Sequence, residues 1–221
     1  MNADLHIAPE SLDRLPLFPL PSAVWFPSTP LALHVFEPRY RALVIDCLAG
    51  DRALAVPLLR PGYEEQYDGA PDFFPVAGVG KILKEQALPG GRWNVLLAGV
   101  LRVRLHEVPS GSSYRTARAE PLDDVYPARG PEALRGEVAT LLSAVSPIVA
   151  FARRTDERFS LGIDAGMSPG RIADLCAHRL LTETNVRQEI LETLDVRVRI
   201  ARVTTEISAR LATMPGTGTL Q

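Results

Sequence analysis

The residues with the clearest chemical potential lie together in one segment, residues 60–74. Four aromatic side chains alternate there with acids and turn-forming residues: Tyr63, Tyr67, Phe73 and Phe74. Aromatic side chains on a loop offer large contact areas to the apolar groups of a partner. The pattern therefore indicates adaptable capture of apolar peptide segments. The alternative is that Phe73 and Phe74 anchor the loop to the core, because most aromatic side chains are buried.

Two tryptophans are further candidates for the same kind of contact. Trp25 precedes Phe26-Pro27, and Trp93 follows the turn sequence Pro89-Gly90-Gly91. Burial in the core is the alternative for each of them as well. Together with the four aromatic residues of the loop, they complete the candidate peptide-binding set.

Neither the acids nor the histidines have the spacing of a metal site. Four acids lie in the loop: Glu64, Glu65, Asp68 and Asp72. They do not match an EF-hand, so we expect a solvated acidic loop. Four histidines are scattered along the chain: His6, His34, His106 and His178. None belongs to a zinc-binding motif, and we predict neither a metal nor a cofactor.

Motifs for covalent or phosphoryl chemistry are also missing from the sequence. There is no Gly-x-Ser-x-Gly elbow. A phosphate-binding loop needs Gly-x-x-x-x-Gly-Lys-Ser/Thr. Here Gly80-Lys81 is followed by Ile82, and Pro75 stands where the first glycine belongs. We therefore predict no catalytic residue and no enzymatic activity for this chain alone.

Composition and charge fit an ordinary globular protein. The chain has 221 residues, of which 46% are hydrophobic and 23% charged, and its net charge is −2. This balance does not call for a nucleic-acid or membrane partner. The N-terminus lacks a signal-peptide layout, and no continuous apolar run approaches the roughly 20 residues of a membrane span. Cys47 and Cys176 read as buried thiols in a reducing compartment, so a cytoplasmic location is expected.

The first part of the chain, to about residue 122, predicts strands with one inserted helix. The expected strands are residues 15–20, 31–36, 53–59, 76–85, 93–108 and 114–122. Pro89-Gly90-Gly91 predicts a hairpin turn, and Gly99 a bulge or barrel corner. Glu37-Pro38 opens the helix, which Gly50 ends. Several short strands with one helix indicate a small, partly closed β-barrel.

From Pro131 onward the apolar period becomes 3.6 residues, which predicts a helical bundle. Ser168-Pro169 is a capped helix start, and Thr184 is expected to cap the next helix. The last helix carries four arginines, predicted to lie on a solvated or interface face: Arg197, Arg199, Arg202 and Arg210. Among them, Arg199 is expected to be a structural ion-pair partner.

The predicted fold class is therefore α+β, with a boundary in the linker near residues 123–131. We expect a β-rich subdomain at residues 1–125 and a helical subdomain at 126–214. Residues 215–221, rich in glycine and threonine, are predicted to be a disordered tail.

Several separate stretches, in the same order along the chain, resemble the N-terminal, substrate-binding domain of the Lon protease family. They are Leu15-Pro-Leu17, Phe26-Pro27, Phe36-Glu-Pro-Arg-Tyr40, Gly80-Lys-Ile82, Gly91, the run from Gly99 to Leu105, and Gln188 to Val196 followed by Arg199-Ile200. The Phe-Glu-Pro-Arg-Tyr sequence is typical of stand-alone members. Trp25 and Ser28 depart from the family pattern and affect the expected local turn. The resemblance implies a PUA-like barrel.

The same resemblance implies a recognition module, since the family's ATPase and protease motifs are absent from this chain. The leading hypothesis is non-catalytic recognition of unfolded or client polypeptides, including a role as an adaptor to a separate ATP-dependent protease. A PUA-like module that binds a small ligand or RNA is the alternative, although the net charge argues against nucleic acid. A hydrolase with an unrecognised site is the third hypothesis.

Overall fold

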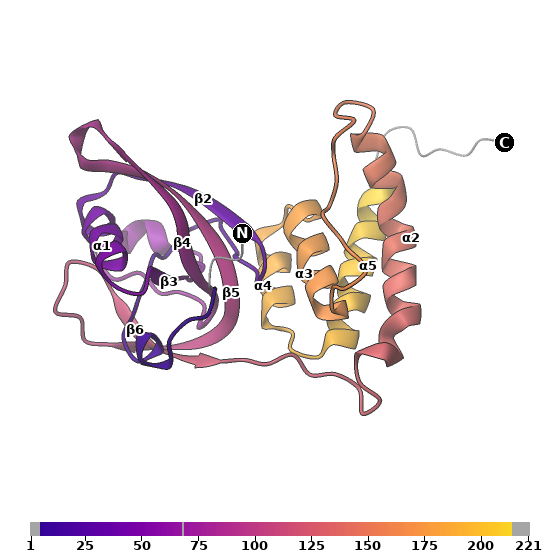
Figure 1. Cartoon of the computed structure of the whole chain (residues 1–221), viewed down its shortest axis with the longest axis horizontal. Coiled ribbons are helices and arrows are strands. Elements are labelled where there is room, and N and C mark those ends of the chain that lie inside the picture. The colour runs from indigo at the N-terminus through magenta and orange to yellow at the C-terminus, as the bar shows by residue number, and fades with distance from the viewer. Residues whose placement is uncertain (1–4, 68, 214–221) are drawn as a thin grey trace. The chain divides into compact units, whose positions relative to one another are not determined.

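The computed structural model describes residues 5–67 and 69–213, and the predicted tail at 215–221 lies outside them. The chain forms two compact units, Met1–Asp123 and Asp124–Gln221. We call them the β unit and the helical unit (Figure 1). The fold class is α+β, as predicted: one antiparallel sheet with an inserted helix, followed by helices.

The β unit is built on one antiparallel sheet with the strand order β1-β6-β5-β4-β3, and β2 pairs with β5 beside this path. Its elements are β1 (Leu15–Pro16), β2 (Pro30–Val35), α1 (Pro38–Ala49), β3 (Ala53–Val56), β4 (Val76–Leu88), β5 (Arg92–Val108) and β6 (Thr116–Pro121). In the described part of the chain, the two ends of this order share no ladder, and the segment after β1 meets β3 and the residues after it only through the isolated bridges Leu17↔Ala55 and Leu20↔Leu58. The barrel is therefore only partly closed.

Two local features of the sheet follow from single residues. The apolar run at residues 53–59 forms a strand only to Val56, because Pro57 has no N–H to donate to a ladder. The predicted irregularity at Gly99 is confirmed. Val79 pairs with Leu101 and Gly80 with Gly99, which leaves Val100 as the extra residue of a bulge.

The segment that contains Trp25 crosses the β4–β5 hairpin where glycines give it room. A Cβ on Gly78 would lie 1.9 Å from the carbonyl oxygen of Trp25, and one on Gly99 would lie 2.3 Å from that of Phe26. Any other residue at these positions would collide with the crossing backbone. Trp25 is consequently 1% exposed, and its Nε1 donates to the carbonyl oxygen of Thr29 at 3.0 Å.

Helix α1 has the predicted ends and lines the larger core cluster of the unit. Glu37 is its N-cap, Pro38 its first residue and Gly50 its C-cap. The buried stripe contains Tyr40, Leu43, Val44 and Cys47, which pack with residues of β3, β4 and β5. The spacing of the apolar residues in the sequence therefore correctly predicted which face of α1 packs against the core.

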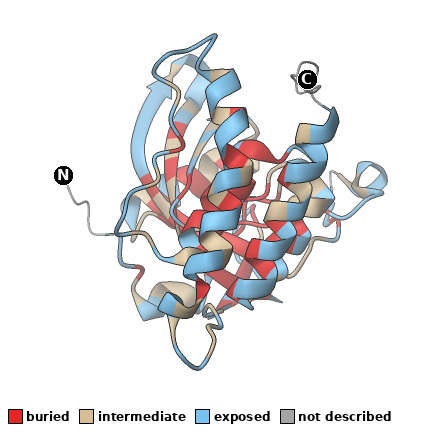
Figure 2. Cartoon of the chain, turned by 90° about the vertical axis from the view of Figure 1, so that its right-hand side faces the viewer, coloured by how far each residue is buried: buried red, intermediate tan, exposed pale blue. Residues whose placement is uncertain are grey.

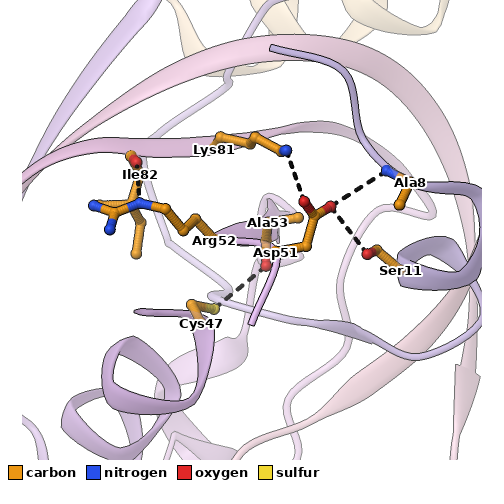
Figure 3. A network of polar contacts seen from close by, with 8 residues as sticks. All are labelled: Ala8, Ser11, Cys47, Asp51, Arg52, Ala53, Lys81 and Ile82. Carbon is orange, nitrogen blue, oxygen red and sulfur yellow. Dashed lines mark hydrogen bonds and ion pairs between the residues drawn. The ribbon is translucent and has the colours of Figure 1, made fainter. Parts of the chain in front are cut away.

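The turn after α1 is held by a polar network around Asp51 (Figure 3). Its carboxylate accepts hydrogen bonds from Lys81 Nζ at 2.7 Å, Ser11 Oγ at 3.0 Å and the Ala8 amide at 3.3 Å. Burial would raise the pKa of Asp51, but the hydrogen bonds from Lys81 and Ser11 outweigh it and hold the pKa below its usual value. The network ties the N-terminal segment to β4.

The helical unit contains α2 (Arg135–Ala152), α3 (Pro169–Leu180), α4 (Thr184–Glu192) and α5 (Val196–Thr213). The helices have exposed residues on one side and buried residues on the other (Figure 2). Ser168 caps α3 as predicted, accepting a hydrogen bond from the Arg171 amide. The prediction for Thr184 was wrong by one position. Glu183 is the N-cap of α4, without a side-chain cap bond, and Thr184 is its first residue.

Arg199 is the charged centre of the helical unit and is 0% exposed. Its Nη2 lies 2.5 Å from Oδ1 of Asp124, and its Nε lies 3.5 Å from Oδ1 of Asp174. The predicted structural ion-pair role of Arg199 is therefore confirmed. Asp124 begins the unit, and the neighbouring Val125 bridges to Asp195 just before α5, so the arginine fastens the entering chain to α3 and α5.

One helical stretch in the described part of the chain has the length and composition of a membrane span. It is Pro131–Ala152, with a mean hydropathy of 1.4 over its best window, of which 22% is buried. Thr140, Ser143 and Ser146 interrupt it, so the stretch agrees with the expectation that no continuous apolar run approaches about 20 residues.

Candidate functional site

The aromatic loop is tied to the start of α1 by a hydrogen-bonded network of three side chains. The hydroxyl of Tyr67 donates to Oε1 of Glu37 at 2.7 Å. Nε of Arg39 donates to Oε2 of the same glutamate at 3.0 Å, and its two terminal nitrogens donate to the carbonyl oxygen of Tyr67 at 3.3 Å. The loop therefore has a fixed attachment close to Phe36, the residue before Glu37.

A stack of rings continues from this network in both directions. Toward the core, the guanidinium carbon of Arg39 lies 4.9 Å from the ring centroid of Tyr40, which stacks on Phe18 at 4.1 Å. Toward the loop it lies 5.2 Å from the ring of Tyr67, whose neighbour Tyr63 is edge-on at 6.1 Å. Cation–π contacts of this kind hold the rings in place. Tyr63 and Tyr67 are thus presented on a support that reaches the core.

Both tyrosines in contact with Arg39 have raised pKa values. Burial raises the pKa of Tyr40 to about 12. The pKa of Tyr67 is raised first by its hydrogen bond to Glu37, because a phenol that donates to a carboxylate is favoured in its neutral form. Both phenols therefore keep their protons at neutral pH, and the hydrogen bond from Tyr67 to Glu37 persists.

The two phenylalanines of the loop are half-buried, each with an arginine above its ring. The guanidinium carbon of Arg115 lies 4.6 Å from the ring centroid of Phe73, and that of Arg60 lies 4.5 Å from Phe74. Phe73 also packs against the second core cluster of the β unit, which includes residues of β3 to β6. The Phe74 amide donates to the carbonyl oxygen of Leu58 at 2.8 Å. Both residues thus hold the end of the loop on the sheet.

The structure does not bring the two tryptophans together with the loop tyrosines. Trp25 is a core residue, 1% exposed where its own segment crosses the β4–β5 hairpin, and it therefore offers no contact surface. Trp93 is half-buried on the β4–β5 hairpin, where it pairs with Val35 and Ala87 and packs against the core cluster. Of the six aromatic candidates, Tyr63 and Tyr67 are the two in ring contact with each other.

Three residues at the start of α1 were missing from the candidate set. Phe36 is 60% exposed, and Glu37 and Arg39 hold Tyr67 in place. All three lie in the Phe36–Tyr40 sequence, which the sequence analysis used only as a family signature. The available signal in the sequence was the aromatic residue Phe36 directly before the predicted helix start at Glu37-Pro38.

A groove of about 660 Å³ lies on the exposed face of the three-stranded ribbon formed by β2, β5 and β4. Its lining includes Ala32, His34, Lys84, Gln86, Asn94 and Leu96. A polar row crosses the ribbon: His34 Nδ1 is hydrogen-bonded to Asn94 Oδ1 at 2.8 Å, and Asn94 Nδ2 lies 3.5 Å from Gln86 Oε1. The row beside it is Ala32, Leu96 and Lys84. The groove combines a small apolar floor with polar groups that bond to one another.

Within residues 5–67 and 69–213, no group of three or more His, Cys, Asp or Glu side chains could hold a metal ion. The arrangement is instead suited to contact with apolar and extended partners. The model of the ATP-dependent protease La (LON) substrate-binding domain matches residues 14–209. The chain belongs to this family.

Relatives with curated descriptions are full-length proteases. Lon protease of Desulfosudis oleivorans is 26% identical over 208 residues, which cover 90% of this chain and 24% of the relative. Lon protease of Syntrophus aciditrophicus is 28% identical over 201 residues, covering 89% and 25%. The chain thus spans about a quarter of the length of the curated relatives it matches.

Two solved structures share the fold. The N-terminal domain of Mycobacterium avium complex Lon protease superposes with a TM-score of 0.65 at 14% identity, over 89% of this chain and 98% of that one. A Lon N-terminal domain protein from Xanthomonas campestris gives 0.58 at 20% identity, over 91% and 99%. These likenesses confirm the Lon N-terminal fold predicted from sequence.

Proposed function

We propose that this chain recognises polypeptides without catalysing a reaction on them, and that it presents unfolded or client segments to a separate ATP-dependent protease. The observation that carries the proposal is a set of three aromatic residues: Tyr63 and Tyr67, in ring contact on the loop, and Phe36, which is 60% exposed just before α1 and stacks with His34 at 6.2 Å. Glu37 and Arg39 bond Tyr67 to the start of α1. The chain also belongs to the LON substrate-binding domain family.

The chemistry of these residues supports binding of apolar segments. Rings on a rigid support lose little conformational entropy when they contact a partner, so more of the contact energy appears as affinity. Tyr63 and Phe36 provide the apolar area, and the network around Tyr67 provides the support. Phe73 and Phe74, both half-buried on the same loop, are proposed as secondary contacts, and Trp93, half-buried on the β4–β5 hairpin, as a separate one.

The proposal is tested with a permanently unfolded probe, fluorescein-labelled reduced and carboxymethylated α-lactalbumin, followed by fluorescence anisotropy. The double variant Phe36→Ala/Tyr63→Ala is expected to raise Kd by about tenfold or more, since buried aromatic contacts each contribute on the order of 1–2 kcal/mol. Ile45→Ala is the matched control, because Ile45 is 54% exposed and lies further along α1, away from the loop. It should change Kd by less than about twofold.

Two outcomes would count against the proposal. Equal Kd values for the double variant and the wild type would remove Phe36 and Tyr63 from the site. Degradation of casein by the purified chain, with or without ATP, would contradict the non-catalytic role.

A further inference from the structure

Strand β2 has an open edge. It pairs with β5 in an uninterrupted register from Pro30↔Ala98 to Val35↔Trp93. The Gly99 amide donates to the carbonyl oxygen of Thr29, one step before this ladder, so bonded pairs recur at every second residue from that point. Leu31 and Leu33 therefore bond to β5, and the N–H and C=O groups of Ala32 and His34 point away from it.

These outward groups have no backbone partner among the described residues. Neither the Ala32 amide nor the His34 amide donates to another segment of the described chain, and both residues are exposed. The direction of the carbonyl groups of β5 agrees with this alternation of bonded and outward residues in β2. The carbonyl oxygen of Ala98 points toward β4, where a Cβ on Gly80 would lie 1.9 Å from it.

Beyond its first residue, the edge of β2 also lacks the features that usually prevent strand addition. Edge strands are commonly protected by proline, charged side chains or bulges. The unpaired edge of β4 has charges and a bulge, with Lys84 and Glu85 next to a register shift between Ile82 and Lys84. In β2, Pro30 has no N–H to offer a partner and protects that end, but residues 31–35 contain no Lys, Arg, Asp or Glu and no bulge. The contrast between the two edges singles out β2.

We infer that the edge of β2 binds an extended polypeptide segment as an additional strand, whose side chains enter the groove beside Ala32 and Leu96. This inference rests on the proposed function and names a second contact through which the same polypeptide is held. Donor and acceptor pairs that repeat every second residue, about 6.8 Å apart, complement the backbone of another extended chain. A small molecule would not match that repeat.

The groove specifies which side chains such a strand would carry. Ala32 leaves space beside Leu96, while His34, Asn94 and Gln86 are hydrogen-bonded to one another. A side chain over Ala32 therefore meets an apolar floor, whereas one over the neighbouring row meets the polar groups of His34, Asn94 and Gln86. The segment should present an apolar residue at that position, as an unfolded segment from a protein core does.

The first test removes the outward amide alone. In Ala32→Pro the lost N–H is the one that faces away from β5, and proline is tolerated in edge strands at such positions. Ala32→Ser keeps the amide and is the matched control. With the labelled, carboxymethylated α-lactalbumin as probe, Ala32→Pro should raise Kd about tenfold, and Ala32→Ser should change it by less than about twofold. An unchanged Kd in a folded Ala32→Pro variant would overturn the inference.

A second measurement does not depend on the folding of a variant. Amide hydrogen exchange of the wild type should slow at Ala32 and His34 when the probe is added, whereas Leu31 and Leu33, already bonded to β5, should change little. If the wild type does not bind the probe, the proposed function fails and the inference fails with it. If it binds while exchange at Ala32 and His34 is unchanged, only the inference fails. A concentration-dependent dimer that Ala32→Pro dissociates without a change in Kd would assign the edge to a second copy.

Discussion

The β unit and the helical unit differ in the kind of contact that stabilises each of them internally. In the β unit the decisive positions have no side chain, because the backbone of Trp25 passes over Gly78 at a distance that excludes a Cβ. In the helical unit the decisive position has a large charged side chain, Arg199, which is fully buried between two aspartates. A crossing segment can thus be fixed by close backbone packing within one unit, and an entering segment by a buried ion pair within another.

Each unit contains one buried cysteine that reports on its unfolding. Burial raises the pKa of Cys47 in the β unit and of Cys176 in the helical unit to about 12. The thiolate is the form that reacts with disulfide reagents, so both thiols should be inert in the native protein. The urea concentration at which each is labelled then measures the stability of the unit that contains it.

The largest effect is expected for Arg199→Met in the helical unit. Removal of one partner leaves the charge of buried Asp174 without this counter-ion, at a cost of about 3–5 kcal/mol. Labelling of Cys176 should shift to a much lower urea concentration than in the wild type. Arg197→Met is the matched control, since Arg197 is exposed and pairs with Glu137 at the surface. Similar labelling midpoints for the two variants would contradict the role of Arg199.

A smaller but clear effect is expected for Gly78→Ala in the β unit. The new methyl group would overlap the Trp25 carbonyl, and such overpacking costs about 1–3 kcal/mol. Labelling of Cys47 should move to lower urea. Gly136→Ala is the control, because no atom lies within 4 Å of its added Cβ and it is inside α2. Alanine there should stabilise the helical unit by about 0.5–1 kcal/mol. An unchanged Cys47 midpoint in Gly78→Ala would show that the crossing can move away.

The smallest effect concerns pH and the Asp51 network of the β unit. Because the pKa of Asp51 is lowered on folding, its contribution is present above its unfolded pKa of about 3.9 and is lost as the pH falls through the folded value. At pH 6 the free energy of unfolding of the wild type should exceed that of Asp51→Asn by less than about 1 kcal/mol, because the pair is partly exposed. The urea midpoint of the wild type should be correspondingly higher. The difference should vanish at the acidic extreme. Glu64→Gln, which alters an exposed loop carboxylate, is the control, and an equal response in both variants would exclude the network as the cause.

Local patterns in the sequence predicted much of this architecture. Glu37-Pro38 and Gly50 marked the ends of α1, Pro89-Gly90-Gly91 gave the hairpin turn, and Ser168 gave the start of α3. In each case the residues that determine the feature are neighbours in the chain. The ion-pair role of Arg199 was also anticipated, since an arginine within an apolar helical stripe needs a buried partner.

The candidate site was harder to predict because its geometry depends on distant residues. The loop composition pointed to Tyr63 and Tyr67, but their support comes from Glu37 and Arg39, some thirty positions earlier. Trp25 was predicted to be a peptide-binding residue for the same reason, its aromatic side chain. Its burial depends on Gly78 and Gly99, whose relation to it is set by strand pairing. The open edge of β2 likewise follows from topology, which no local pattern encodes.

The pairing of the first strand with the last has a consequence for synthesis of the chain. Leu15 pairs with Ala117, and β2 pairs with the first half of β5. The apolar N-terminal segments leave the ribosome first, yet their partners emerge only when most of the β unit has been translated. Such long-range pairing slows folding and leaves hydrophobic strands exposed in the meantime. A module proposed to hold unfolded polypeptides should therefore itself require protection by a chaperone while it is being made.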